Sequence, residues 1–189
     1  EWTFFVSHTQ RNASAAGMAE KITNELERRG HSCWLDVKMR DKSEAAMREG
    51  VQNCKCVLAL ITGPGVNNDR PADAPESNAY FNREYCLQEL RWAKEAGIPI
   101  QPIVRAQDKP RIGEFLAAAP DDLKDLGQVD FIHLDGSDID YWNLGIDKVL
   151  QAFSMVGPPQ RHFVDSSATF QWDAPSAAGA QQLSAASAP

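Results

Sequence analysis

The sequence predicts an α/β domain in which one parallel sheet carries helices on both faces. Short apolar runs alternate along the chain with longer segments whose apolar residues recur at helical spacing. The run at residues 56–61 (CVLALI) is apolar throughout, as expected of a strand that is buried on both faces of a sheet. The chain holds five strand-like runs, and the intervening helical segments favour right-handed crossovers between parallel strands.

The first strand and helix precede Gly30. Residues 2–6 are a short apolar run that stops at the polar pair Ser7 and His8. Over residues 13–29 apolar residues recur at helical spacing with charged residues opposite, which predicts an amphipathic helix. Gly30 then follows as a residue typical of a helix C-terminus.

The second and third strands lie on either side of a charged loop and a helix. Residues 33–35 (CWL) predict the second strand, and residues 38–42 are charged without apolar periodicity, so they predict a loop. Ser43 is a suitable N-cap for the helix that follows. The third strand, at 56–61, leads into residues 63–78, whose proline and glycine content predicts a long exposed loop.

A third helix and two more strands complete the predicted sheet. The helix is expected over residues 82–96, and residues 98–104 (IPIQPIV) predict the fourth strand. Pro99 and Pro102 favour an edge position or a strand start for it. Residues 129–134 (VDFIHL) predict the last strand.

A closing helix and a tail follow the last strand. Residues 140–153 predict the helix, with Leu144, Val149, Leu150 and Phe153 as its inward-facing residues. From residue 157 the chain is rich in Ala, Ser, Gln and Pro, a composition that cannot drive a packed core. We therefore expect one domain over residues 1–156 and a largely extended or disordered tail over residues 157–189.

Composition excludes several classes of protein. The net charge of −7 and pI of about 5.1 argue against a partner that is nucleic acid or an anionic membrane. No apolar run is long enough to span a bilayer. The four cysteines have apolar neighbours, which predicts reduced, buried thiols in a cytoplasmic protein. The C-K-C at 54–56 lacks a second pair of ligands, so no metal site is predicted. Because the chain opens on a strand without Met, we expect an excised piece of a longer protein.

Polar residues at the strand ends predict a ligand site. In open parallel sheets, ligands bind beyond the carboxyl ends of the strands, where the strand order reverses. This rule brings Ser7, His8 and Asp36 to one rim with the segment that enters the third helix. The chain contains neither GxGxxG nor GxxxxGK[ST], so no dinucleotide fingerprint or P-loop applies. Helical spacing places Glu89 between Tyr85 and Trp92 on one stripe of the third helix. The adjoining apolar face, which is expected to pack on the sheet, consists of Cys86, Leu87, Leu90 and Ala93.

Simpler interpretations of these residues stay open. Taken alone, Glu89 is an ordinary acidic residue of a helix surface. Ser7 and His8 do not suggest a nucleophile and its base, because adjacent strand residues point to opposite faces. A strand-end serine that forms a hydrogen bond with backbone or ligand is the better interpretation. A receiver domain has the same sheet but requires an acidic pair near the first strand, where this chain has Ser7 and His8.

Four segments together resemble the Toll/interleukin-1 receptor (TIR) domain family. They are FFVSHTQRN at 4–12, CWLDVKMRDKS at 33–43, CVLALITG at 56–63 and YFNREYCLQEL at 80–90. The last resembles the family's S-x-W-C-x-x-E-L signature, in a C-L-x-E-L form. The order and spacing agree over about residues 1–155.

The resemblance implies a flavodoxin-like fold with five parallel strands and, for many members, hydrolysis of NAD at the nicotinamide–ribose bond. NAD is then the substrate, and no cofactor is expected. Glu89 matches the essential glutamate of the hydrolytic members, whose carboxylate would stabilise an oxocarbenium-like ribose. The candidates for substrate binding are Ser7, His8, Trp34, Asp36, Lys38, Arg40, Tyr80, Tyr85 and Cys86. Trp34 is either the ring that stacks on nicotinamide or adenine or an ordinary core residue.

The resemblance also implies partners and an alternative. Its members act through TIR–TIR self-association or with other TIR-containing proteins, and some are adaptors without catalysis. Two positions depart from the signature: Tyr85 replaces its Trp, and Arg83 replaces its Ser, which puts a cation at the pocket entrance.

Overall fold

A single five-stranded parallel sheet organises the domain. The computed structural model describes residues 1–41 and 43–156, and the strand order within them is β2-β1-β3-β4-β5. The strands are β1 (Trp2–Ser7), β2 (Cys33–Trp34), β3 (Cys54–Leu60), β4 (Ile100–Arg105) and β5 (Ile132–Leu134). The order reverses between β1 and β3, which places the switch point of the sheet at the end of β1. The predicted fold class is confirmed, although β5 is shorter than expected.

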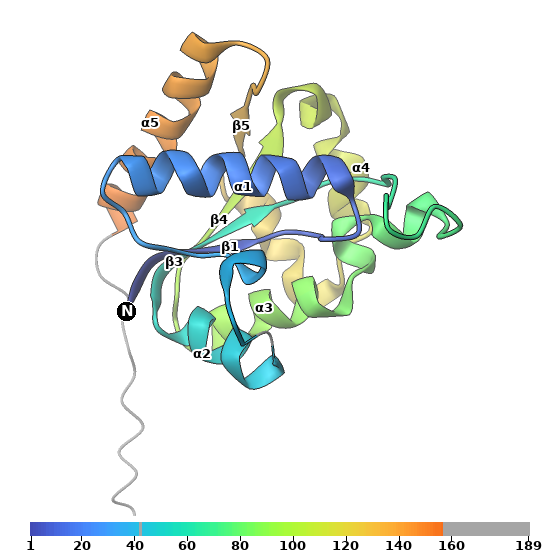
Figure 1. Cartoon of the computed structure of the whole chain (residues 1–189), viewed down its shortest axis with the longest axis horizontal. Helices are drawn as coiled ribbons and strands as arrows, with labels where there is room; N and C mark the ends of the chain where they lie inside the picture. Colours follow the sequence, from blue (N-terminus) through green and yellow to red (C-terminus); the bar gives the residue numbers. More distant parts are fainter. Residues whose placement is uncertain (42, 157–189) are drawn as a thin grey trace, which may run out of the picture.

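Helices cover both faces of the sheet (Figure 1). Helices α1 (Ala13–Arg28) and α5 (Ile139–Val156) lie on one face. Helices α2 (Glu44–Gln52) and α3 (Glu84–Glu95) lie on the other, where the short α4 (Ile112–Ala117) and the 3₁₀ segment Asp121–Gln128 extend the layer. The expected caps form: Ser43 Oγ accepts from the Ala46 amide at 3.2 Å, and Gly30 has a φ of 86° after α1.

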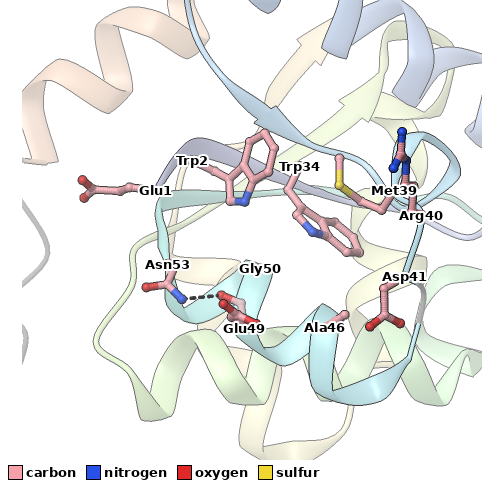
Figure 2. Close-up of a pocket in the computed structure, with 10 residues that line it drawn as sticks. All are labelled: Glu1, Trp2, Trp34, Met39, Arg40, Asp41, Ala46, Glu49, Gly50 and Asn53. Atoms are coloured by element: carbon pink, nitrogen blue, oxygen red, sulfur yellow. Dashed lines mark hydrogen bonds between the residues drawn. The ribbon is translucent and has the colours of Figure 1, made fainter.

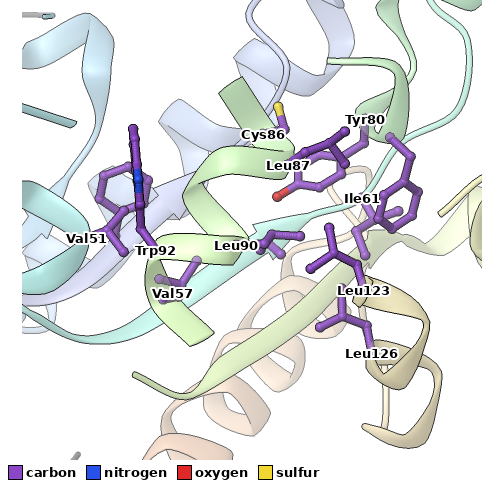
Figure 3. Close-up of a cluster of buried hydrophobic side chains, with 14 of the residues drawn as sticks. Val51, Val57, Ile61, Tyr80, Cys86, Leu87, Leu90, Trp92, Leu123 and Leu126 are labelled. Carbon is purple, nitrogen blue, oxygen red and sulfur yellow. The ribbon is translucent and has the colours of Figure 1, made fainter. Parts of the chain in front are cut away.

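Alternation along β3 divides the core between the two faces. Val57, Ala59 and Ile61 point toward α2 and α3, whereas Leu58 and Leu60 point toward α1 and α5. The predicted apolar face of α3 packs on this sheet, and its members are Cys86, Leu87, Leu90 and Ala93. In Figure 3 the Tyr80 ring lies among these side chains, next to Leu87.

Strand β4 lies inside the sheet, so the edge position predicted from its prolines is wrong. Pro99 and Ile103 give their carbonyl groups to β3, so the alternating residue Pro102 turns its nitrogen toward β5. Pairing with β5 begins only at Ile103. Pro102 therefore lies just before the hydrogen-bond ladder between β4 and β5, so its missing N–H group leaves that ladder intact. Pro99 does precede the strand, as expected of a strand start.

The segment 63–78 is mostly exposed, as predicted, but it is also pinned to the domain by buried side chains. Its last residues form a 3₁₀ turn at Pro75–Asn78, and the side chains of Asn67 and Asn78 are buried. The Asn12 amide donates to the Gly63 carbonyl at 3.2 Å, and Asn78 donates to Gly65 at 3.0 Å. These amides satisfy backbone groups that would otherwise need water, so the loop can pack against the domain.

The inward face of α5 also differs from the prediction. Leu144 is half exposed, and Trp142, Ile146 and Val149 are the buried residues. Leu144 lies five residues before Val149, which places it off the stripe that faces the sheet. The predicted tail over 157–189 lies outside the described residues.

Candidate active site

A carboxylate is buried at the switch point of the sheet. Helix α3 starts at Glu84, after the 3₁₀ turn Tyr80–Asn82, and carries its apolar stripe across the sheet. Glu89 lies beside that stripe, one turn after Tyr85, and is only 7% exposed. Its carboxylate reaches the carboxyl end of β1, where Ser7 is the last strand residue.

A chain of hydrogen bonds holds one oxygen of this carboxylate. Ser7 Oγ donates to Glu89 Oε2 at 2.6 Å, and the Tyr80 hydroxyl lies 2.6 Å from the same Oγ. Since Ser7 has one hydroxyl proton and gives it to Glu89, the Tyr80 hydroxyl is the donor to Ser7. Within the described part of the chain, Glu89 Oε1 makes no hydrogen bond. One oxygen is thus anchored and the other is available to a ligand.

Burial changes the proton affinity of this group. The pKa of Glu89 is raised to about 8, mainly by burial; the Ser7 hydrogen bond opposes the shift, and the charge of Asp36 adds to it. The carboxyl group is therefore mostly neutral at pH 7 in the empty site. Burial also raises the pKa of the Tyr80 phenol and the Cys86 thiol well above their usual values, so both stay protonated.

Glu89 opens onto a cavity of about 260 Å³ between the ends of β1 and β2 and the start of α3. The strand ends and the loop after β1 supply one wall, and α2 and α3 supply the other. The residues that line the cavity are His8, Thr9, Gln10, Arg11, Asp36, Met47, Arg83, Tyr85, Cys86 and Glu89. The predicted rim is thus a real concave surface.

His8 is one of the polar residues that line this cavity. Its Nδ1 lies 3.4 Å from the Val6 carbonyl, whereas Nε2 is buried without a hydrogen-bond partner within the described residues and lies 4.0 Å from Asp36 Oδ1. Burial lowers the pKa of His8 despite the neighbouring Asp36 charge, so the ring is neutral. With the proton on Nδ1, Nε2 is a hydrogen-bond acceptor.

The structure brings seven of the ten predicted residues together: Glu89 and its contacts Ser7 and Tyr80, and the cavity residues His8, Asp36, Tyr85 and Cys86. Cys86 Sγ also donates to the His8 carbonyl at 3.4 Å, which ties α3 to the end of β1.

Three predicted residues lie elsewhere. Trp34 stacks on Phe5 at a centroid distance of 4.4 Å and, with Arg40, lines a separate cavity of about 430 Å³ beside α2 (Figure 2). Lys38 turns toward α1 and pairs with Glu27 at 2.7 Å. Trp92 is buried in the core, so Glu89 is not held between two rings. Tyr85 alone is exposed, at the rim of the cavity.

Five residues that line the cavity were not among the candidates predicted from the sequence: Thr9, Gln10, Arg11, Met47 and Arg83. Arg83 could have been predicted, because it replaces the Ser of the family signature and so differs from the family at this position. The three loop residues follow directly after Ser7 and His8, so the strand-end rule could have included them.

The fold and the site define the class of this protein: a doubly wound α/β domain with a buried carboxylate at the switch point. The family model described as TIR domain matches residues 4–144. The chain therefore belongs to the TIR domain family.

Solved structures agree with this assignment at the level of the fold. The TIR domain of the Toll-related receptor TRR-2 from Hydra magnipapillata is 12% identical with a TM-score of 0.51, over 82% of this chain and 99% of that chain. The TIR domains of the activated Roq1 resistosome, which directly recognises the pathogen effector XopQ, are 12% identical with a TM-score of 0.52, over 80% of this chain and 99% of that chain. A search of curated proteins found no match.

None of the helices within residues 1–41 and 43–156 is both long enough and apolar enough to cross a bilayer.

Proposed function

We propose that this TIR domain is an NAD glycohydrolase that cleaves the nicotinamide–ribose bond, with Glu89 as its catalytic carboxylate. The observation that carries the proposal is the placement of Glu89: one oxygen is fixed by Ser7, and the residue opens onto a cavity at the switch point of the sheet. A fixed carboxylate in a largely buried site is suited to stabilise positive charge that develops in a transition state.

The reaction needs one such group. When the bond between ribose C1′ and the pyridinium nitrogen breaks, its electron pair returns to nitrogen, and nicotinamide leaves as a neutral base. Positive charge then develops on the ribose, where Glu89 stabilises it and accepts a hydrogen bond from a ribose hydroxyl. Water completes the reaction to ADP-ribose and releases a proton; attack by the adenine ring gives a cyclic ADP-ribose instead.

The raised pKa of Glu89 is compatible with this role. In the empty site the carboxyl group is mostly neutral because it is buried. The pyridinium ring of NAD carries a positive charge, and an opposite charge close to a carboxyl group favours its ionised form. Substrate binding therefore promotes the carboxylate that the reaction requires.

The proposal includes self-association with a second TIR domain. Three apolar side chains on or near the first turn of α5 are exposed: Ile139 by 68%, Tyr141 by 65% and Leu144 by 50%. Such side chains favour a protein contact. With the Roq1 resistosome as a relative in fold, we propose a role in immune or cell-death signalling. The four free, buried thiols suit the reducing cytoplasm.

The test is nicotinamide release from NAD by the concentrated domain and by a form fused to an oligomerising tag. We expect release by the wild type and at least a hundredfold loss in Glu89→Gln, the magnitude typical of a group that stabilises the transition state. Glu84→Gln is the control, because Glu84 is an exposed glutamate on the same helix. Full activity in Glu89→Gln, or an inert wild type in both forms, would overturn the proposal. An inert wild type would support the alternative, a TIR adaptor that acts through assembly alone.

A further inference from the structure

Two arginines at the mouth of the cavity are unpaired. Arg11 and Arg83 line the same cavity as Glu89, and neither has an acidic side chain within 4.0 Å in the described part of the chain. Six other arginines do pair, among them Arg91 with Asp122 at 2.8 Å and Arg105 with Asp108 at 2.6 Å, whereas Arg40 and Arg70, which lie outside this cavity, have no such pair among the described residues. In a chain with a net charge of −7, carboxylates are in excess, so two unpaired arginines in one cavity indicate an external anion.

Arg83 stands where arginine is locally unfavourable. It is the N-cap residue of α3, and its side chain makes no cap hydrogen bond. Serine or aspartate would satisfy a free amide there, whereas arginine adds a positive charge to the positive end of the helix dipole. Burial lowers the pKa of Arg83, and the charge of Arg11 lowers it further. Residues kept against local stability are expected at functional sites.

The surroundings favour an anionic ligand over an internal partner. Arg83, at the start of α3, lines the cavity, and the first backbone N–H groups of a helix favour anions such as phosphate. His8 lines the same cavity, and its buried Nε2 has no hydrogen-bond partner among the described residues. Guanidinium groups bind phosphate oxygens through two parallel hydrogen bonds, and two of them match the two charges of a diphosphate.

We propose that Arg83 and Arg11 form a subsite for the diphosphate of a dinucleotide substrate, and that Arg83 determines specificity for it. The inference rests on the proposed glycohydrolase function. It assigns the scissile bond to Glu89 and the selection of a dinucleotide over smaller nicotinamide compounds to the arginines. Nicotinamide riboside has the same scissile bond but no phosphate, so it separates the two roles.

The first experiment compares kcat/KM for NAD and for nicotinamide riboside in the wild type and Arg83→Ser. Serine is a preferred N-cap, so the variant should fold and show a raised melting temperature. We expect kcat/KM for NAD to fall about tenfold to a hundredfold, as for loss of a charged hydrogen-bonding partner, mainly through KM. The value for nicotinamide riboside should stay within about twofold of the wild type, because only uniform binding to the diphosphate is lost.

The companion variants sharpen the test. Arg11→Ser should show the same selective loss. Arg28→Ser is the matched control, because Arg28 is exposed at the end of α1 and pairs with Glu25 at 2.7 Å. An equal loss on both substrates, or no loss on NAD, would overturn the diphosphate subsite.

A binding experiment separates failure of the subsite from failure of the proposed reaction. If the wild type releases no nicotinamide from either substrate, the glycohydrolase proposal fails. Calorimetric titration with ADP-ribose then decides the subsite by itself. Binding to the wild type that weakens about tenfold or more in Arg83→Ser supports the subsite; no binding to the wild type, or equal binding to both proteins, refutes it.

Discussion

Replacing Glu89 by Gln should make the protein less sensitive to alkaline pH. The pKa of the glutamate is 4.5 in an unfolded chain and about 8 when it is buried in the fold. Between these pH values the folded protein binds a proton that the unfolded chain does not, so the stability of the wild type falls as the pH rises and levels off above about 8. Glutamine cannot ionise and keeps an oxygen that accepts from Ser7, so this pH dependence should disappear.

The size of the effect follows from the two pKa values. Each pKa unit corresponds to about 1.4 kcal/mol, so the full difference from 4.5 to about 8 has an upper limit of about 5 kcal/mol. Relative to the wild type, Glu89→Gln should therefore gain about 2–5 kcal/mol in unfolding free energy between pH 5 and pH 9, with most of the gain below pH 8. Other ionisable groups contribute equally to both proteins and cancel in the comparison.

The assay is urea unfolding followed by tryptophan fluorescence at several pH values from 5 to 9. Glu84→Gln serves as the control, because its exposed carboxyl group should give a flat difference from the wild type. A difference between wild type and Glu89→Gln that stays within about 0.5 kcal/mol across the range would refute the argument, since it would mean that the folded protein ionises Glu89 as easily as an exposed glutamate.

Three further outcomes are expected. Nicotinamide release should show a kcat/KM that rises with pH as the free carboxyl group ionises and levels off above about 8, whereas a pH-independent profile would separate Glu89 from the reaction. Ser7→Ala should lower kcat/KM about tenfold and move that rise to higher pH, because the donor that opposes the raised pKa is lost; unchanged pH profiles would contradict the hydrogen bond. Gly50→Ala should destabilise the fold by about 1–3 kcal/mol in urea unfolding, since a Cβ atom there would lie 2.8 Å from Trp34 Nε1, and a stabilised variant would refute the close packing of α2 on that ring.

The rim of the site could be predicted because it depends on topology. Ser7, His8 and Asp36 each follow a strand-like run, and the carboxyl ends of parallel strands meet at one edge of the sheet. Helical spacing likewise placed Cys86 and Leu90 on the sheet and Glu89 beside them. These inferences needed only the two side-chain periodicities of strands and helices.

The details that failed depend on contacts without a period. Strand β2 has two residues, so the sequence carried too little alternation to show that Trp34 would stack on Phe5 and face a different cavity from Glu89. The hydrogen bond from Tyr80 to Ser7 depends on how the loop before α3 folds back, and the buried amides of Asn12 and Asn78 fix that path. The composition of residues 63–78 indicated an exposed loop but carried no information about the path that the loop takes.

The electrostatics of the empty site account for the order of events in the proposed reaction. With Glu89 mostly neutral and Arg11 and Arg83 unpaired, the cavity attracts the anionic half of a dinucleotide first. In the proposed reaction the pyridinium charge then favours the Glu89 carboxylate, which stabilises the ribose as nicotinamide departs. A compound with the pyridinium but no diphosphate lacks the first attraction and should bind more weakly, whereas one with the diphosphate but no pyridinium leaves Glu89 mostly neutral. In this proposal the diphosphate therefore contributes to binding, and the pyridinium sets the reactive charge state of the site.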